Sequence, residues 1–183
     1  HYRSHSFPTR RSSDLAFLRG LTKAAALLFG VVAVLLLSGH GLWQGRITTG
    51  DLANAIALML LVGFAEELLF RGWLWGELEL LTGRKRAIGI QAAVFALVHP
   101  WYQLPPVEAI ALLMGLVLLG LALALQRRAD NGVLWGSIGL HGGLVGGWFA
   151  LQAGLITLPG TSSIWLLGTG GANPNPISGL LGW

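Results

Sequence analysis

The run VEAIALLMGLVLLGLALALQ, from Val107 to Gln126, constrains the fold more than any other feature of the chain. It carries one charged residue, Glu108, close to its start and none after it. A helix needs roughly 20 consecutive apolar residues to cross the hydrocarbon core of a bilayer. The run therefore predicts a membrane-spanning helix.

Four further apolar segments share this character, and only 11% of the residues are charged, against about 25% in a soluble domain. The chain length fits one compact bundle. We therefore expect an all-α, polytopic transmembrane helix bundle with about five apolar helices. The second segment is long for one span, so its surplus around GELELL is expected at the membrane interface. The four segments are approximately Ala24–His40, Leu52–Leu81, Ala87–Tyr102 and Gly132–Leu151.

Composition excludes several classes of function. The chain has no cysteine, so it contains neither a disulfide framework nor a thiolate zinc site. Its formal net charge is +4, but the basic residues are scattered in pairs and triplets between apolar runs. That distribution does not suit nucleic acid, and the expected partner is the lipid bilayer.

The basic residues predict the orientation of the chain. One cluster precedes the first apolar segment, the second follows the second segment, and the third follows the fourth. Cytoplasmic loops carry an excess of Lys and Arg, and these clusters fall on alternate loops, so all three are expected on the cytoplasmic side. The clusters are Arg19 with Lys23, Arg84–Arg86, and Arg127 with Arg128.

Residues 1–15 are polar, basic and without periodicity, unlike the rest of the chain. The stretch from His5 to Leu15 resembles a translated sequencing adapter. We therefore expect residues 1–15 to be a non-native leader that packs poorly against the spans. Residues 16–183 are expected to form a single membrane domain, truncated at both ends. An adapter of this kind suggests a draft assembly, which favours a bacterial cytoplasmic membrane as the location of this multi-pass protein.

The segment GFAEELLFRG places Glu66, Glu67 and Arg71 inside the second apolar run. A charge at the bilayer centre costs about 2.5–3.5 kcal/mol on insertion scales, so these side chains need partners. Glu67 and Arg71 are four residues apart and are expected to pair on one helix face. Glu66 points about 100° away, which leaves it available for chemistry. The structural alternative is a buried ion pair that only fixes helix packing.

Two histidines occupy other apolar segments. His99 follows the second basic cluster at the same spacing as His141 follows the third, about 20 Å along a helix. Both are therefore expected at one depth, and a turn at LLTG would bring Glu66 to a similar level. The glycines of GSIGLHGGLVGGW allow close helix approach, which would press His141 against its neighbours.

These groups support two chemistries. A carboxylate and an imidazole near one point can deprotonate a water molecule, and a second imidazole can donate to a developing oxyanion. Glu66, His99 and His141 are also possible zinc ligands, and the sequence leaves both readings open. In either case, a glutamate oxygen is expected within about 6 Å of a His99 nitrogen, close enough to share a water molecule.

The set of motifs resembles the CPBP family of CAAX-processing and bacteriocin-processing intramembrane proteases, also called Abi-type. The family pattern is EExxxR, then FxxxH, then HxxxN or HxxxD, on successive membrane helices. Here Glu66 to Arg71 gives the first motif, Phe95 to His99 the second, and His141 begins the third. The resemblance covers about residues 51–151 and implies that residues 16–183 are a CPBP-type domain.

The resemblance implies a role for each site residue. Glu66 would be the general base on water, helped by His99, while Glu67 and Arg71 would shape and hold the site. His141 would stabilise the oxyanion, although Val145 replaces the family's Asn or Asp in the third motif. We favour a metal-free glutamate-type mechanism with no cofactor, with a zinc-dependent metalloprotease as the alternative.

The expected function is therefore hydrolysis of a peptide bond in a membrane-associated protein or peptide. Two alternatives remain open. The first is an inactive relative that serves as a membrane scaffold or immunity factor, which Val145 favours. The second is a proton-coupled carrier that uses Glu66 and His99 as a relay; it should show broken helices or inverted repeats, and the sequence shows neither.

Overall fold

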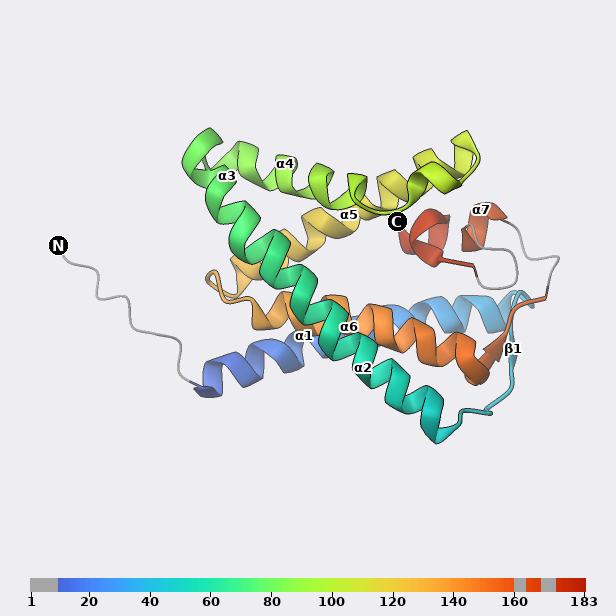
Figure 1. Cartoon of the computed structure of the whole chain (residues 1–183). Coiled ribbons are helices and arrows are strands. Elements are labelled where there is room, and N and C mark those ends of the chain that lie inside the picture. Colours follow the sequence, from blue (N-terminus) through green and yellow to red (C-terminus); the bar gives the residue numbers. More distant parts are fainter. Residues whose placement is uncertain (1–9, 160–163, 169–173) are drawn as a thin grey trace.

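A computed structural model gives the fold, and it describes residues 10–159, 164–168 and 174–183 (Figure 1). The described chain is predominantly helical, which confirms the all-α prediction. The helical segments follow the predicted apolar runs. They are α1 (Arg10–Leu37), α2 (Thr49–Glu66) continued by the π-helix η1 (Glu67–Leu74) and by α3 (Trp75–Thr82), then α4 (Arg84–Leu97), α5 (Pro106–Ala129) and α6 (Trp135–Ala150).

Three of these helical stretches are long and apolar enough to cross a membrane: Ser13–Leu37, Thr49–Thr82 and Pro106–Ala129. The helices α4 and α6 have 14 and 16 residues, which is shorter than the roughly 20 residues of a full span. The predicted number of about five helices is therefore met, with three full-length spans among them.

Local sequence signals set the helix boundaries. The long second helix begins after Thr48, whose hydroxyl accepts from the Asp51 amide while the Asp51 carboxylate accepts from the Thr48 amide; this reciprocal capping box satisfies two free helix N–H groups. Gly83 separates α3 from α4 with a φ of 80°, a backbone conformation that favours glycine. Helix α5 starts with Pro106 in its first turn, where the missing N–H costs nothing. The predicted turn at LLTG is thus confirmed.

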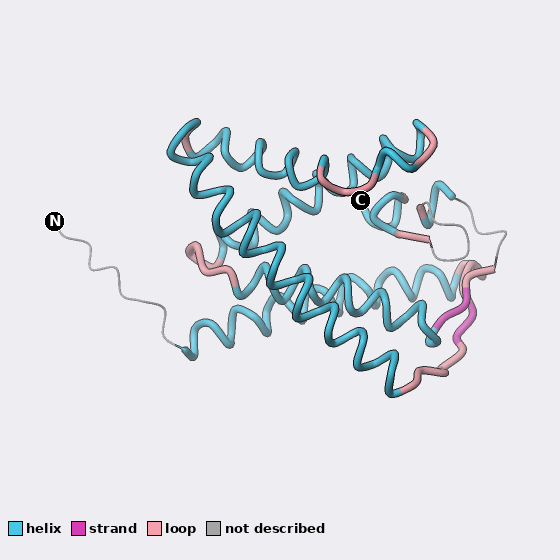
Figure 2. The backbone as a smooth tube through the Cα atoms, in the orientation of Figure 1, coloured by secondary structure: helices cyan, strands magenta, loops and turns pink. Residues whose placement is uncertain are grey.

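The helices form two layers joined by one long element. In Figure 1, α4 and α5 lie together in the upper layer, while α1 and α6 lie side by side in the lower layer. The stretch Thr49–Thr82 begins beside α6 and ends against α4. Its middle therefore passes the junction of the two layers (Figure 2), and α2 gives way to η1 there, between Glu66 and Glu67.

Helix α6 lies unusually close to α1 and α2 because glycine lines both contacts. A methyl group at Gly139 would clash with the main-chain oxygen of Phe17 in α1, and one at Gly142 with the main-chain oxygen of Met59 in α2. On the facing helix, a Cβ at Gly63 would lie 2.7 Å from Cα of Gly142. The predicted close approach is confirmed, and it brings His141 against the long helix.

The connections complete the fold. Strands β1 (Leu42–Trp43) and β2 (Ile156–Thr157) pair antiparallel in a two-stranded sheet, with Leu42 opposite Thr157. This short pairing is a feature that the sequence did not indicate, and it ties the loop after α1 to the chain that leaves α6. The remaining short elements are η2 (Trp101–Gln103), η3 (Leu151–Leu155), α7 (Ile164–Leu167), η4 (Pro176–Ser178) and η5 (Leu180–Gly182).

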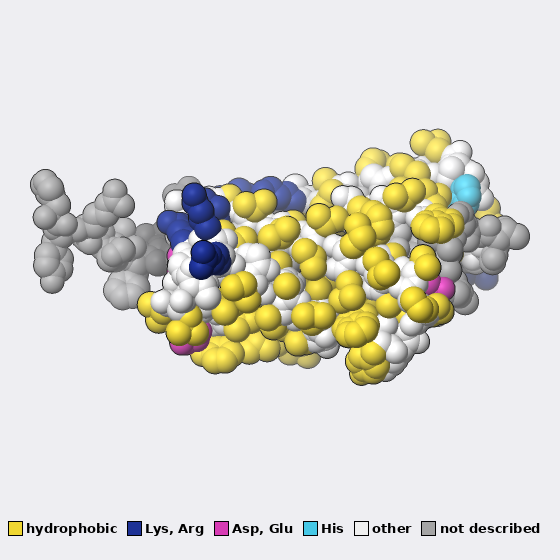
Figure 3. All heavy atoms as spheres, turned by 90° about the horizontal axis from the view of Figure 1, so that it is seen from above, with side chains coloured by type: hydrophobic (Ala, Val, Ile, Leu, Met, Phe, Trp, Pro, Cys, Tyr) yellow, Lys and Arg dark blue, Asp and Glu magenta, His cyan; other side chains and the backbone are white. Residues whose placement is uncertain are grey.

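The molecular surface matches an integral membrane protein. Large apolar side chains are exposed along the spans, as with Phe29, Leu61 and Leu80, and apolar atoms cover most of the face in Figure 3. Most of the lysines and arginines seen in Figure 3 gather toward one end. Arg19 pairs with Asp130 at 2.5 Å, just beyond the end of α5.

The other two basic clusters lie at that same end, since Arg84, Arg127 and Arg128 line one pocket. The three clusters therefore share one end of the spans, as the alternating-loop argument predicted. Residues 1–15 were predicted to be a non-native leader that packs poorly against the spans. Of these residues the structure describes Arg10–Leu15, which form the start of α1. Leu15 is exposed there, and residues 1–9 lie outside the described residues.

Candidate active site

The segment from Glu67 to Leu74 is a π-helix inside the long second helix. Its hydrogen bonds span five residues rather than four, as in the bond from the Trp75 amide to the Phe70 carbonyl. π-Helical turns are rare and occur frequently at functional sites. This one holds Glu67 and Arg71 of the EExxxR motif.

Glu67 and Arg71 form the predicted pair. Nη1 of Arg71 donates to Oε1 of Glu67 at 2.9 Å, and both side chains are fully buried. The same Oε1 atom lies 2.9 Å from Nδ1 of His141 in α6. Because a carboxylate only accepts, the hydrogen bond assigns a proton to Nδ1. Glu67 thus fixes both the guanidinium and the orientation of the imidazole.

Glu66 approaches the other side of the same imidazole. Its Oε2 atom lies 3.8 Å from Nε2 of His141, and its side chain retains 31% exposure. The two adjacent glutamates therefore differ: Glu67 is enclosed, whereas Glu66 is partly open. A doubly protonated His141 would have a carboxylate beside each nitrogen.

His99 lies just beyond the end of α4, which stops at Leu97. Its Nδ1 atom is 2.7 Å from the main-chain oxygen of Phe95, so Nδ1 donates, and in the neutral imidazole Nε2 is then the acceptor. Within the described residues, no hydrogen bond or ion pair joins His99 to Glu66 or Glu67. The direct partner of both glutamates is His141, while the expected separation of about 6 Å from His99 stays a prediction.

The ring of Phe95 connects the polar groups of the site. This ring is fully buried and makes edge contacts with His99 and His141 at centroid distances of 4.8 and 5.8 Å. The guanidinium carbon of Arg71 lies 4.2 Å from the same centroid, within the range of a cation–π interaction. Both histidines thus contact one ring from two different helices, while their equal depth in the membrane stays a prediction.

Several polar atoms around this ring have no hydrogen-bond partner among the described residues. They are Oε2 of Glu66, Oε2 of Glu67, and Nε and Nη2 of Arg71, all inaccessible at the surface. Buried polar groups are normally satisfied by protein or water. The cluster therefore retains acceptors and donors that can bind a water molecule or the polar groups of a peptide.

The arrangement does not fit a zinc ion well. A catalytic zinc site takes three protein ligands around one point. In the described part of the chain, no group of three or more His, Cys, Asp or Glu side chains is arranged to hold a metal. The two nitrogens of His141 face carboxylates instead. The metal-free mechanism stays a prediction.

Two contributors were not assigned a role from the sequence. In the sequence, Phe95 is only the first letter of FxxxH, whereas in the structure its ring contacts His99, His141 and Arg71. Arg127 was read as a topology signal, yet its Nη1 donates to the main-chain oxygen of Arg71. Arg71 lies in the π-helix, where the backbone hydrogen bonds are shifted by one residue. No sequence motif indicates that its carbonyl group accepts a hydrogen bond from Arg127.

Comparison with known families identifies the chain. The family model for type II CAAX prenyl endopeptidase Rce1-like proteins matches residues 48–146, more than half of the 183 residues. The matched region contains Glu66, Glu67, Arg71, His99 and His141. No curated protein and no solved structure matches the chain. With its apolar spans and buried Glu–Arg–His cluster, the chain belongs to the Rce1-like family of type II CAAX prenyl endopeptidases.

Proposed function

We propose that this protein is an intramembrane endopeptidase that hydrolyses a peptide bond of a membrane-associated protein or peptide. Family membership supports a CAAX-type endopeptidase in general terms. The observation that carries the proposal for this chain is the meeting of Glu66, Glu67 and Arg71 with His141 of another helix. If the cluster served only to pack the helices, Glu67 alone would be enough to pair with Arg71. The second glutamate, Glu66, instead faces the imidazole of His141.

Glu67 acts as the positioning residue for His141. Its Oε1 atom accepts from both Arg71 and His141, so the ring is held with Nε2 directed toward Glu66. A carboxylate that orients a histidine and stabilises its protonated form is a recurrent element of hydrolytic sites. Arg71 fixes Glu67 in turn, with its own guanidinium against the ring of Phe95.

Glu66 is the general base in this proposal. Its Oε2 atom is buried without a hydrogen-bond partner among the described residues, while the side chain stays partly exposed. A water molecule bound there can lose a proton to the carboxylate. His99 assists as a second acceptor, because the bond to the Phe95 carbonyl leaves its Nε2 lone pair available.

The hydrolysis then proceeds in two steps. The oxygen of the deprotonated water bonds to the scissile carbonyl carbon, and the carbonyl oxygen becomes an oxyanion that accepts from protonated His141. The C–N bond breaks next, and the proton held by Glu66 passes to the leaving nitrogen. Water is consumed, and one new carboxyl group and one new amine result.

The test is cleavage of a membrane-peptide library by the full chain in detergent, comparing wild type with Glu66→Gln. A general base contributes about 10²- to 10⁴-fold, so the substitution should lower kcat by at least about 100-fold. Glu77→Gln is the matched control, since Glu77 lies on the same long helix and is exposed. Equal activity of Glu66→Gln and wild type would overturn the assignment of the base.

The same assay separates the metal-free mechanism from the zinc alternative. If Glu66 and His99 activate water directly, treatment with a strong chelator leaves the cleavage rate unchanged. If a zinc ion supplied the activation, chelation would remove the activity and added zinc would restore it. Glu66 would then have to be reassigned as a ligand.

One observation favours a second candidate, an inactive family member that serves as a membrane scaffold. Val145 stands where the family pattern has Asn or Asp, so the amide or carboxyl beside His141 is missing. Restoring it with Val145→Asn should raise kcat by about 100-fold, the scale of one oxyanion donor, if that donor limits the reaction. Absence of cleavage in both wild type and Val145→Asn would favour the scaffold.

A further inference from the structure

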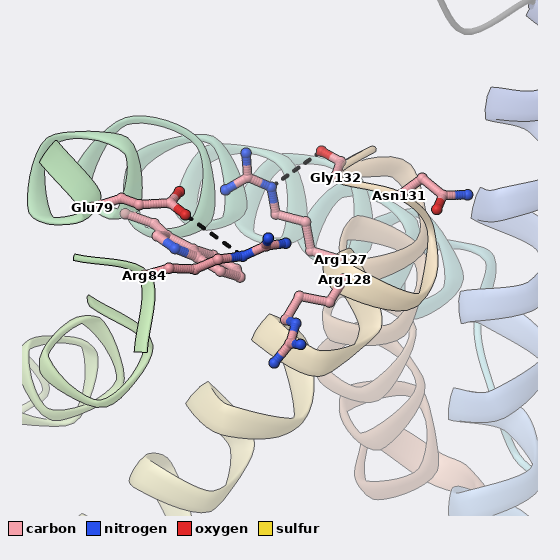
Figure 4. Close-up of a pocket in the computed structure, with 7 residues that line it drawn as sticks. Glu79, Arg84, Arg127, Arg128, Asn131 and Gly132 are labelled. Atoms are coloured by element: carbon pink, nitrogen blue, oxygen red, sulfur yellow. Dashed lines mark hydrogen bonds and ion pairs between the residues drawn. The ribbon is translucent and has the colours of Figure 1, made fainter. Parts of the chain in front are cut away.

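A polar pocket lies away from the Glu–Arg–His cluster, at the basic end of the spans. It has a volume of about 280 Å³ and lies where α3, α4 and the loop after α5 meet. Figure 4 shows Arg84, from the start of α4, and Arg127, from the end of α5, extending toward each other. The full lining is Trp75, Glu79, Arg84, Arg127, Arg128, Asn131 and Gly132.

Positive charge is in excess around this pocket. Three arginines face one glutamate, a net charge of +2. Glu79 neutralises only part of this charge, because it pairs with Arg84 at a distance of 3.6 Å. Arg127 donates through Nε to the Gly132 carbonyl, and the described residues give Arg128 no ion-pair partner. Converging like charges favour an anion between them.

A buried donor on the wall of the pocket also points to a ligand. Trp75 is only 3% exposed, and its indole Nε1 has no hydrogen-bond partner among the described residues. Indole nitrogen is a donor only, and a buried donor without an acceptor is costly. The guanidinium of Arg127 lies over the same ring at 4.8 Å. An oxygen-rich anion would satisfy the indole and the arginines together.

The position of the pocket narrows the class of anion. Arginine forks suit phosphate because they donate two parallel hydrogen bonds to its oxygens. Basic pockets between membrane helices on the cytoplasmic side are suited to anionic lipid headgroups, and this end carries all three basic clusters. We propose that the pocket of Trp75, Arg84, Arg127 and Arg128 binds a phosphate-bearing anion, supplied by an anionic phospholipid headgroup or by a free phosphate ester.

Binding of defined probes to the full chain in zwitterionic detergent tests this proposal without reference to proteolysis. The probes are dioctanoyl phosphatidylglycerol, dioctanoyl phosphatidylcholine as the zwitterionic control, and glycerol 1-phosphate, with Kd measured by microscale thermophoresis. Wild type should bind phosphatidylglycerol at least about 10-fold more tightly than phosphatidylcholine. Binding of glycerol 1-phosphate as well would identify a free phosphate ester as a ligand. If phosphatidylglycerol binds tightly and glycerol 1-phosphate does not bind, the ligand is the headgroup of an anionic lipid.

The variant Arg84→Gln/Arg128→Gln removes two charges from the pocket and leaves Arg127, which also bonds to the site helix. Its matched control is Lys85→Gln/Arg86→Gln, which removes two charges from the adjacent turn outside the pocket lining. The pocket variant should weaken binding of phosphatidylglycerol by about 10-fold or more, and the control by much less. Equal weakening in the two variants, or no binding of either phosphate probe by wild type, would overturn the proposal.

Discussion

Two ion pairs of this protein lie in opposite situations, one inside the long second helix and the other where that helix gives way to α4. Glu67 and Arg71 are fully buried, and each is held by a partner at 2.9 Å. Toward the basic end, Glu79 and Arg84 are 3.6 Å apart, with side-chain exposures of 42% and 70%. Breaking a buried pair leaves an uncompensated charge in a medium that solvates it poorly. Exposed pairs are solvated whether or not they touch. Similar residues therefore hold a fixed geometry in the buried region, whereas near the basic end they form a solvent-exposed pair.

The largest effect should come from removing one partner of the buried pair. Arg71→Met leaves the Glu67 carboxylate buried, so the free energy of unfolding should fall by about 3–5 kcal/mol. Unfolding in mixed micelles with increasing dodecyl sulfate measures it. Arg71→Met/Glu67→Gln should recover part of the loss, because no unpaired charge remains. A loss below about 1 kcal/mol in the single variant would mean that the two regions do not differ in the way we describe.

The close approach of α6 keeps the buried region enclosed, and a single methyl group tests it. Gly142→Ala would push the new Cβ against the main-chain oxygen of Met59, and overpacking of this kind costs about 1–3 kcal/mol. Because Gly142 follows His141, cleavage should fall together with stability. Gly89→Ala in α4, where a Cβ meets nothing within 4 Å, is the control. Similar behaviour of the two variants would show that α6 has room to shift.

Replacing Phe95 with leucine should have an intermediate effect. The substitution removes the ring that Arg71 faces at 4.2 Å, and a desolvated cation–π interaction contributes up to about 2 kcal/mol. We expect a loss of about 1–2 kcal/mol in unfolding free energy, and a lower kcat because both imidazoles lose the same contact. If the stability and the kcat of the variant equal those of wild type, Phe95 neither stabilises Arg71 nor helps to position the two imidazoles.

The smallest effect is expected at the basic end. Arg84→Gln breaks an exposed pair, and such pairs contribute about 0–1 kcal/mol. The unfolding free energy should change by less than about 1 kcal/mol, and raising the salt concentration should shrink the difference further. A change as large as that of Arg71→Met would show that the basic end is also held by specific ion pairs.

Much of this arrangement was readable from the sequence, because it depends on short-range rules. Apolar run lengths predicted the helices, and glycine spacing predicted the closeness of α6. The separation of four residues between Glu67 and Arg71 predicted their pairing. Equal spacing from the basic clusters predicted one depth for His99 and His141, which stays a prediction, although both rings contact Phe95.

The remaining features depend on contacts between distant segments. The π-helix over Glu67–Leu74 is a shift of one residue in backbone hydrogen bonding, and side-chain periodicity does not encode such a shift. That both glutamates reach His141 rather than His99 follows from the way α6 lies against the long helix. The ending of α4 at Leu97 also gives His99 a local partner in the Phe95 carbonyl. Each of these outcomes is decided by tertiary packing.

The glycine-lined contacts of α6 also bear on how the protein is made. Among the five main helices α6 is the last along the chain, and its 16 residues are fewer than a full span requires. Glycine contributes little to the free energy of inserting a helix from the translocon into lipid. Helix α6 therefore depends on its contacts with α1 and α2. Both of those helices are synthesised earlier, since the chain emerges from its N-terminus at about 5–20 residues per second. The helices that α6 packs against are therefore made before α6 itself, and His141 joins Glu66 and Glu67 only after α1 and the long second helix have been synthesised.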